Sequence, residues 1–403
     1  MNNKNQSSPI HVYSEIGQLK KVLVHKPGNE IKYITPDTME ELLFNGLLEP
    51  NQVAKEHDEF VKILKNEGVE VVYLEDLVLE TFQKSSESAR DDFIRTWIRE
   101  CEVRETKILR IINKYIRSLS PREMIQKMFS GILASDIDIE SYSEIIVKPM
   151  PNSYFTRDVF SSVGCGIVFS RMKYPIRRRE SIFSRFIFRY HPDYKNTPLL
   201  FDHDSHYSIE GGDIFVYNDK TLVVGVSERT EFDAIKILAE NLMKNDAVDF
   251  NKIYCIYVPH EKNLMHLDTW LTMIDHNKFL YSPNMLKQLK VWEISLTNNE
   301  LQVKLLKKNL RELLKLIIKK EPILIPVGGG KSQMRIDIET YFDASNFLAI
   351  RPGVVIGYDR NIDTIAEMKK HGIKVLAFSG NQLSLGMGSA RCMTMPLWRE
   401  DIK

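Results

Sequence analysis

The sequence predicts an α/β fold in which similar modules surround a shared centre and one helical segment is inserted. Three segments read as strand, polar loop, helix and strand, and they begin at LKKVLVHKP (19–27), TLVVGVSERT (221–230) and GVVIGYDRN (353–361). Two of their helices stop at a glycine before an apolar run, in LKNEGVEVVYL and MKKHGIKVLAF. A repeat of such long and irregular period favours modules around one centre over a stacked solenoid.

The helices and closing strands of these segments follow from apolar spacing and β-branched runs. In the first segment we expect a helix over residues 52–67 and then the strand VEVVYL. In the second, the helix FDAIKILAENLMKN precedes the strand KIYCIYVP. In the third, the helix TIAEMKKH precedes the strand IKVLAF.

Residues 75–143 differ from the rest of the chain in composition and residue spacing. Their apolar residues recur every three or four positions, charged residues are abundant, and helix-breaking residues are few. Phe93, Trp97 and Ile98 fit one helical face. We therefore expect an inserted α-helical subdomain over 75–143 within a single domain that covers 1–403. A second charged stretch, LQVKLLKKNLRELLKLIIKKEP (301–322), predicts another helix with its Leu/Ile face on the core.

Composition indicates a soluble globular protein with ample core material. The chain has 403 residues, a formal charge of +1 and 43% hydrophobic content. This near-zero charge argues against nucleic acid or an anionic membrane as the main partner, and the basic run RMKYPIRRRE (171–180) is interpreted as a solvated loop or helix start. Neither a signal peptide nor a membrane helix is evident, so we expect a cytoplasmic protein. The four scattered cysteines predict separate, reduced thiols.

Four short motifs carry side chains suited to chemistry: PNSYFTRDVF (151–160), SIEGGDIFVY (208–217), NLMHLDTWLTMID (263–275) and LGMGSARCMTMPLW (385–398). Taken singly they are weak signals, because EGGD is more often a turn and a lone HxD more often a structural histidine. Together they supply a thiol, an imidazole and several carboxylates, which fits a cysteine nucleophile with a histidine acid/base. Carboxylates beside a reactive thiol raise its pKa unless the substrate is cationic, so a cationic substrate is indicated.

Two other patterns are interpreted as loops. PVGGGKS (326–332) lacks the first glycine of a phosphate-binding loop, where Ile325 stands. FDHDSHY (201–207) offers His203 and His206 without an evident third metal ligand.

The motifs NSYFTRD, EGGD, MHLDT and LGMGSARCMTMPL, in this order and at these separations, make the chain strongly resemble the arginine deiminases. The resemblance covers essentially the whole chain and is greatest to the mycoplasma-type members. These are guanidine-modifying enzymes of the pentein fold. The resemblance therefore implies a pentein-type α/β propeller of pseudo-symmetric ββαβ modules around a central active site.

What the resemblance implies chemically is hydrolysis of L-arginine to L-citrulline and ammonia. Cys392 matches the nucleophile and His266 the general acid/base, which Glu210 supports. Asp158 and Asp268 match the carboxylates that hold the guanidinium. It further implies no metal or organic cofactor, no nucleic-acid or membrane partner, and a homodimer.

The resemblance also gives a set of substrate-binding residues. Its members are Asn152, Phe155, Arg177, Asp213, Arg229, Gly386 and Arg391. Arg177 and Arg229 would bind the substrate carboxylate with help from Asn152, and Phe155 would pack on the substrate. The chain departs from many relatives at Val159, where they have proline, and from some at Met387, where they have arginine; Arg391 would serve instead.

Two other functions remain open at this stage. Another guanidine-modifying enzyme, such as an agmatine deiminase or an amidinotransferase, would share the nucleophile. A catalytically silent arginine-binding protein would have no reason to keep Cys392, His266, Glu210, Asp158 and Asp268 together.

Overall fold

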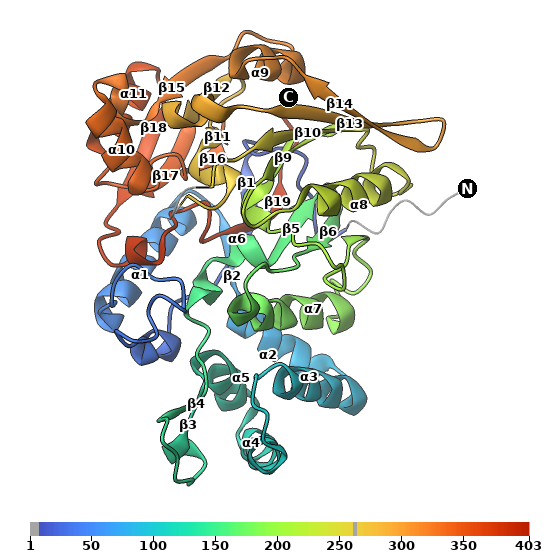
Figure 1. Ribbon diagram of the computed structural model, residues 1–403, viewed down its shortest axis with the longest axis vertical. Helices are drawn as coiled ribbons and strands as arrows, with labels where there is room; N and C mark the ends of the chain where they lie inside the picture. The colour runs from blue at the N-terminus through green and yellow to red at the C-terminus, as the bar shows by residue number, and fades with distance from the viewer. Residues whose placement is uncertain (1–7, 261–263, 403) are drawn as a thin grey trace.

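The computed structural model describes residues 8–260 and 264–402, whose strands form six sheets (Figure 1). Five of the sheets repeat one pattern, which we call a blade: the first strand pairs antiparallel with the second, the second pairs parallel with the third, and a helix connects these two. The parallel pair needs this helical crossover, whereas the antiparallel pair does not. The chain is thus built from ββαβ units.

The central strands of the five blades follow one another along the chain. The first contains β19 (Met395–Arg399), β1 (Leu19–Val24), α1 (Pro50–Asn66) and β2 (Glu70–Tyr73). The second contains β5 (Phe160–Val163), β6 (Gly166–Phe169), α7 (Ser181–Tyr190) and β7 (Leu199–Phe201). The third contains β8 (Ile214–Asn218), β9 (Thr221–Val226), α8 (Phe232–Met243) and β10 (Lys252–Tyr257). The fourth contains β11 (Leu271–Met273), β12 (Lys278–Tyr281), α9 (Leu310–Ile318) and β15 (Ile323–Pro326). The fifth contains β16 (Leu348–Arg351), β17 (Val354–Tyr358), α11 (Ile362–Lys370) and β18 (Lys374–Phe378), and α10 (Gln333–Tyr341) precedes it.

The three modules expected from the sequence are the first, third and fifth blades, and their helices and strands are confirmed. The second and fourth blades escaped the sequence reading because their strands are only three or four residues long. In the fourth, moreover, the hairpin of β13 (Val291–Thr297) and β14 (Glu300–Leu306) separates β12 from its crossover helix and pairs with the third blade instead.

The helix expected over residues 301–322 is wrong in its first part. Residues 300–306 form β14, and α9 begins only at Leu310, where Asn309 and Glu312 make a reciprocal capping box. LQVKLL alternates with a period of two residues, which suits a strand paired on one side, and the cap then fixes where the helix starts.

Residues 75–143 contain most of four helices, which gather at one end of the molecule, lowest in Figure 1. They are α2 (Leu74–Lys84), α3 (Glu87–Arg99), α4 (Thr106–Ser118) and α5 (Pro121–Ser130), followed by the short pair β3 (Ile132–Leu133) and β4 (Ile145–Val147). Phe93 of α3 stacks on Phe186 of α7 at 4.2 Å, and Phe129 of α5 stacks on Phe183 at 4.0 Å. The helical segment therefore shares one hydrophobic core with the second blade.

Two further sequence interpretations can be compared with this fold. PVGGGKS contains the short 3-10 turn η8 (Val327–Gly330), which is irregular because three consecutive glycines, residues 328–330, have positive φ. The basic run is only partly solvated, because Arg179 is buried and donates to the Lys148 carbonyl at 2.7 Å, so the surface interpretation is wrong for that residue. Within the described residues, no helix is both long and apolar enough to cross a membrane.

Candidate active site

The polar motifs of the sequence lie in turns that immediately precede the first strands of different blades. Asp158 is in α6 (Thr156–Val159) before β5, and Asp213 ends η5 (Gly211–Asp213) before β8. Asp268 is in η6 (Leu267–Thr269) before β11, and Cys392 precedes β19. Because first strands with the same role lie around one centre, residues far apart in sequence converge there.

His266 and Glu210 form a buried pair at this centre. The imidazole Nε2 donates to Glu210 Oε2 at 2.8 Å, and Glu210 Oε1 accepts from the backbone N–H of Lys173 at 2.9 Å. Burial opposes a charged imidazole, but Asp158, the Glu210 hydrogen bond and Asp213 outweigh it and raise the pKa of His266 to about 9. Burial likewise opposes a charged Glu210, yet Arg229 and His266 lower the pKa of that carboxyl to about 2. The pair is therefore an imidazolium and a carboxylate at neutral pH.

Asp158 and Asp268 are matched carboxylates. Arg177 Nη1 donates to Asp158 Oδ2 at 2.8 Å, and Arg391 Nη1 donates to Asp268 Oδ2 at 2.8 Å. The second oxygen of each, Oδ1, is buried and has no hydrogen-bond partner among the described residues. His266 Nδ1 lies 3.8 Å from Asp158 Oδ1, beyond hydrogen-bonding distance. Two buried acceptors of negative charge thus remain to be satisfied, which is costly unless a cationic donor binds them.

Cys392 lies between these groups. Its Sγ is 3.5 Å from Asp268 Oδ2 and its side chain is buried. Burial and the carboxylates of Asp268, Asp158 and Asp343 raise the pKa of the thiol well above its ordinary value, against a smaller opposing effect of Arg391. The thiol is therefore protonated until positive charge enters the site, as expected from the sequence.

The expected substrate-binding residue Arg391 is part of the protein interior. Its guanidinium donates to Glu15 at 3.2 Å, to Asp268 at 2.8 Å and to the Ile214 carbonyl at 3.0 Å, and it lies 3.8 Å above the Phe215 ring. Because the N–H groups of its guanidinium donate to acceptors of the protein, Arg391 orients Asp268 in this structure.

The two arginines expected to bind the substrate carboxylate are also engaged. Arg177 is held by Asp158 and by Glu180, whose oxygen accepts from Nη2 at 2.9 Å. Arg229 lies 3.4 Å from Glu210 through Nη1 and 4.4 Å above the Tyr174 ring, while its buried Nε has no partner among the described residues. Arg229 thus retains a donor, whereas Arg177 is neutralised by two carboxylates.

Asn152 and Asp213, two of the remaining expected residues, are both buried and hydrogen-bonded. Asn152 Nδ2 donates to the Leu42 carbonyl at 2.7 Å. Asp213 accepts from the Leu267 N–H at 2.8 Å and from Ser227 Oγ at 2.6 Å, so it anchors the turn that carries His266 and Asp268.

The glycines of the nucleophile motif make close contacts. A Cβ on Gly388 would lie 2.5 Å from the Phe155 ring and 3.0 Å from Cys392 Cβ. One on Gly386 would lie 1.8 Å from the Tyr154 hydroxyl. Gly388 therefore allows the backbone to approach both Phe155 and Cys392, and Gly386 permits close packing on Tyr154.

A cavity of about 580 Å³ borders this cluster. Its lining includes Met39, Phe44, Tyr174, Arg229, Met265 and Met387. Arg229 pairs with Glu210 and Met265 directly precedes His266, so the cavity leads to the imidazole–carboxylate pair. Met387, which stands where some relatives have arginine, is an apolar part of this entrance.

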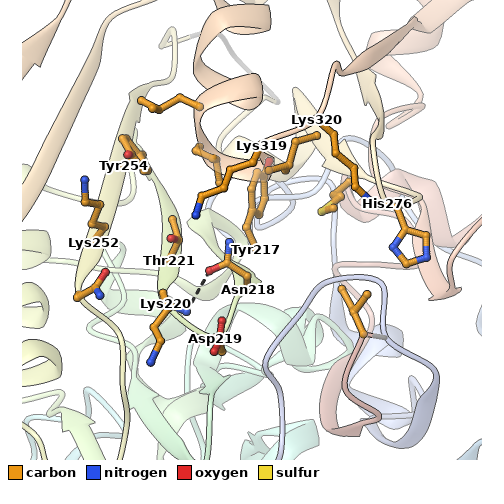
Figure 2. A pocket seen from close by; sticks show the side chains of 16 residues that line it. Tyr217, Asn218, Asp219, Lys220, Thr221, Lys252, Tyr254, His276, Lys319 and Lys320 are labelled. Atoms are coloured by element: carbon orange, nitrogen blue, oxygen red, sulfur yellow. Dashed lines mark hydrogen bonds between the residues drawn. The ribbon is translucent and has the colours of Figure 1, made fainter.

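A separate cavity of about 600 Å³ is lined largely by polar and basic side chains (Figure 2). Among its lining residues, Lys220 pairs with the exposed Asp249 at 3.4 Å, and Lys252 pairs with Glu293 at 3.5 Å. None of the residues that line it is an expected site residue, so it does not contribute to the centre described above.

Over residues 8–260 and 264–402, two groups of side chains could offer three ligands to a metal ion, Asp158–Glu210–His266 and Asp202–His203–Asp204. In the first group Glu210 and His266 are bonded to each other, and Arg177 and Arg229 already place positive charge on the carboxylates. In the second, Arg185 contacts His203 Nε2. In the first group Asp158 Oδ1 is therefore the ligand atom that still lacks a hydrogen-bond partner among the described residues, and in the second His203 already contacts Arg185 as well as Asp202 and Asp204.

The sequence reading missed two residues at this centre, Asp343 and Asn346 of FDASNF. Both are buried, and the Asp343 carboxylate contributes to the raised pKa of Cys392. The signal that could have found them is their place in a polar turn just before the first strand of a blade, β16. That signal becomes readable only once the five blades are known.

The chain is similar to known proteins in both sequence and fold. A family model described as "Arginine deiminase" matches residues 40–399. The chain is 52% identical over 398 residues to the arginine deiminase of Metamycoplasma hominis, and the match covers 98% of this chain and 97% of that protein. It is 50% identical over 399 residues to the arginine deiminase of Metamycoplasma arthritidis, with 98% of each covered. Among solved structures, the amidinotransferase SxtG from Microseira wollei matches with a TM-score of 0.57 at 16% identity and 98% coverage of both chains, which shows a common fold.

Proposed function

Because the chain belongs to the arginine deiminase family, we propose that its Cys392 centre hydrolyses L-arginine to L-citrulline and ammonia. The observation that carries the proposal is the pair of buried oxygens, Asp158 Oδ1 and Asp268 Oδ1, which have no hydrogen-bond partner in the described part of the chain and lie near a thiol and an imidazolium. A guanidinium supplies the positive charge and the planar set of N–H donors that these oxygens lack.

Binding of the guanidinium prepares the nucleophile. With its edges held by Asp158 and Asp268, the guanidinium leaves one face open to the sulfur of Cys392. Its positive charge offsets the carboxylates that raise the pKa of the thiol, so the thiol loses its proton to solvent when substrate arrives. Binding of the guanidinium therefore also activates the Cys392 thiol.

In the first half-reaction the thiolate adds to the guanidinium carbon and forms a C–S bond. The tetrahedral adduct collapses when the imidazolium of His266 transfers its proton to the departing nitrogen, which leaves as ammonia. Glu210 stabilises the imidazolium through its 2.8 Å hydrogen bond. A cationic amidino-thioether on Cys392 remains.

In the second half-reaction, the now neutral imidazole takes a proton from water, and the oxygen adds to the same carbon. Collapse of this adduct breaks the C–S bond, releases citrulline and returns Cys392 and protonated His266. These steps use only protein groups and water.

Recognition of the amino-acid part of arginine is assigned to the cavity that borders the cluster. Arg229 has a buried Nε without a partner among the described residues and is the better candidate for the substrate carboxylate. Arg177 would serve the carboxylate only after exchanging Glu180, so in this structure its contact with Asp158 dominates. Asp213 and Arg391 act through their contacts with the η6 turn and with Asp268.

Incubation of the purified protein with arginine, agmatine and methylated arginines, with citrulline-type product measured, tests the proposal. We expect product from arginine, and Cys392→Ala should abolish turnover while arginine binding remains measurable by calorimetry. Product from agmatine alone would indicate an agmatine deiminase, and binding without product from any substrate would indicate a silent arginine-binding protein.

Two further properties follow from the family resemblance, a homodimer and a cytoplasmic location. Light scattering of the purified protein tests the first, and fractionation of cells that express the chain tests the second. A monomer at all concentrations, or activity in a membrane or secreted fraction, would contradict them.

A further inference from the structure

The fifth blade contributes a residue to the centre that the proposed chemistry does not use. The other four blades place Asp158, Asp213, Asp268 and Cys392 just before their first strands. The corresponding turn of the fifth blade, before β16, carries Asn346, whose side chain is fully buried. Its position in the blade is thus equivalent to that of the reacting groups.

Asn346 holds the loop that carries the nucleophile. Its Oδ1 accepts from the backbone N–H of Cys392 at 3.0 Å and from that of Ser389 at 3.2 Å. Its own carbonyl accepts from the N–H of Arg391 at 3.2 Å. Three backbone donors of one short loop therefore end on a single residue.

The same side chain holds the turn of the carboxylate opposite the thiol. Asn346 Nδ2 donates to the Asp268 carbonyl at 3.2 Å. The neutral amide thus offers an acceptor to the nucleophile loop and a donor to the Asp268 turn at once. A carboxylate in its place would face the Asp268 carbonyl without a proton and add negative charge beside the thiol.

We propose that Asn346 is a positioning residue that fixes the Cys392 sulfur against the Asp268 carboxylate. The role in turnover rests on the proposed function, whereas the attachment of the loop to the turn does not. Asn346 is expected to touch neither substrate nor the reacting atoms.

The first test compares Asn346→Ala with the control Asn241→Ala. Asn241 lies in α8, outside the centre, and its amide donates to the Leu200 carbonyl of β7. Arginine turnover is measured together with alkylation of Cys392 by iodoacetamide, read by mass spectrometry of its peptide. Asn346→Ala should lower kcat about 100-fold, the loss that misplacement of a reacting group by about 1 Å causes. Its KM should stay within about threefold of the parent value, because Asp158 is untouched and Arg391 still holds the Asp268 carboxylate.

Alkylation should change in the opposite direction. A thiol released from Asp268 is more readily ionised, so Asn346→Ala should be alkylated faster than the parent protein and Asn241→Ala at the same pH. Parent-like kcat in Asn346→Ala, or reduced kcat with the alkylation rate of Asn241→Ala, would overturn the proposal. If Asn346→Ala is alkylated faster but the parent protein itself does not convert arginine, the attachment of the nucleophile loop to the Asp268 turn is supported and the proposed function is refuted.

Asn346→Asp gives a second, independent measurement, which also serves if Asn346→Ala does not fold. The protonated form of the introduced carboxyl regains a donor for the Asp268 carbonyl, and the ionised form does not. The kcat of Asn346→Asp relative to the parent should therefore rise as pH falls. If the ratio of the two kcat values does not depend on pH, Asn346 does not bridge the Cys392 loop and the Asp268 turn in the way proposed.

Discussion

At the scale of single residues, the centre keeps its nucleophile inactive until a cation is present. Cys392 is buried 3.5 Å from a carboxylate oxygen of Asp268, and the pKa of its thiol is raised well above its ordinary value. The neighbouring Arg391 opposes this only in part, because Glu15 shares its charge. Reaction with small electrophiles in the absence of substrate is thereby suppressed.

Removal of the Asp268 charge should separate thiol reactivity from catalysis. In Asp268→Asn, Arg391 remains beside the sulfur without its opposing carboxylate, so the pKa of Cys392 falls. We expect alkylation of Cys392 by iodoacetamide at neutral pH to rise about tenfold or more, the effect of one pKa unit, while arginine turnover is lost. Asp249→Asn, at an exposed carboxylate, is the control and should change neither. Slower alkylation in Asp268→Asn would contradict this account of the thiol.

The imidazolium of His266 should make stability depend on pH. The folded protein raises the pKa of His266 from 6.5 to about 9, so its contribution is fully present below pH 6.5 and is lost as pH rises through 9. We expect the free energy of unfolding, from urea titrations, to fall over this interval by up to about 3 kcal/mol. His266→Gln has no titrating group there and should show a smaller fall. An equal fall in both proteins would assign the dependence to other groups.

Sequence alone identified the reacting types but not every orientation. Cys392, His266, Glu210, Asp158 and Asp268 were expected together, and the structure brings them together. Whether an arginine faces substrate or the interior depends on packing, so the interior contacts of Arg391 with Glu15 and Phe215 could not be foreseen. Asn346 was not predicted, because only its place just before the first strand of a blade indicates a role, and that blade has to be known first.

At the scale of elements, short turns position the reacting groups more than helices do. The EGGD motif is the clearest case, since η5 brings Glu210 and Asp213 beside the His266 turn. Its glycines are required by close approach: a Cβ on Gly211 would lie 2.0 Å from the Arg157 carbonyl, and one on Gly212 would lie 2.5 Å from His266 Nδ1. The motif is therefore both a turn and a support for the imidazole.

Gly212→Ala should consequently impair catalysis with little loss of fold. The added methyl group displaces the imidazole, and a shift of about 1 Å at a reacting group lowers kcat about 100-fold. Gly372→Ala is the matched control: Gly372 has φ +76 and open space around it, so that substitution should lower stability but leave kcat unchanged. Steady-state kinetics and urea unfolding measure the two effects. Equal kcat in the two variants would show that the contact with His266 is unimportant.

At the scale of the whole molecule, five ββαβ blades form the pentein-type α/β propeller that the sequence resemblance implied. Three blades were readable from their apolar runs, whereas two have strands too short for such a signal and were not. The boundary of the inserted helices is blurred for a related reason. Their apolar faces pack on α7, which belongs to the second blade, so periodicity alone does not mark where one unit ends.

This shared core predicts that the helical segment and the propeller unfold as one unit. Phe129 stacks on Phe183 at 4.0 Å, and Phe129→Ala should cost about 3–5 kcal/mol in free energy of unfolding. Urea transitions followed by far-UV circular dichroism and by arginine turnover should coincide in both proteins and shift together in the variant. Loss of helical signal before loss of turnover would show that the inserted helices form an independent subdomain.

The pairing of β19 with β1 has a consequence for biosynthesis. These strands belong to opposite ends of the sequence, and backbone hydrogen bonds between His11 and both Leu397 and Arg399 extend their contact. A ribosome therefore produces four blades and their carboxylates before Cys392 and the strand that completes the first blade. A nascent chain that ends before Cys392 lacks both the nucleophile and the strand β19 that pairs with β1, so it cannot form the covalent intermediate.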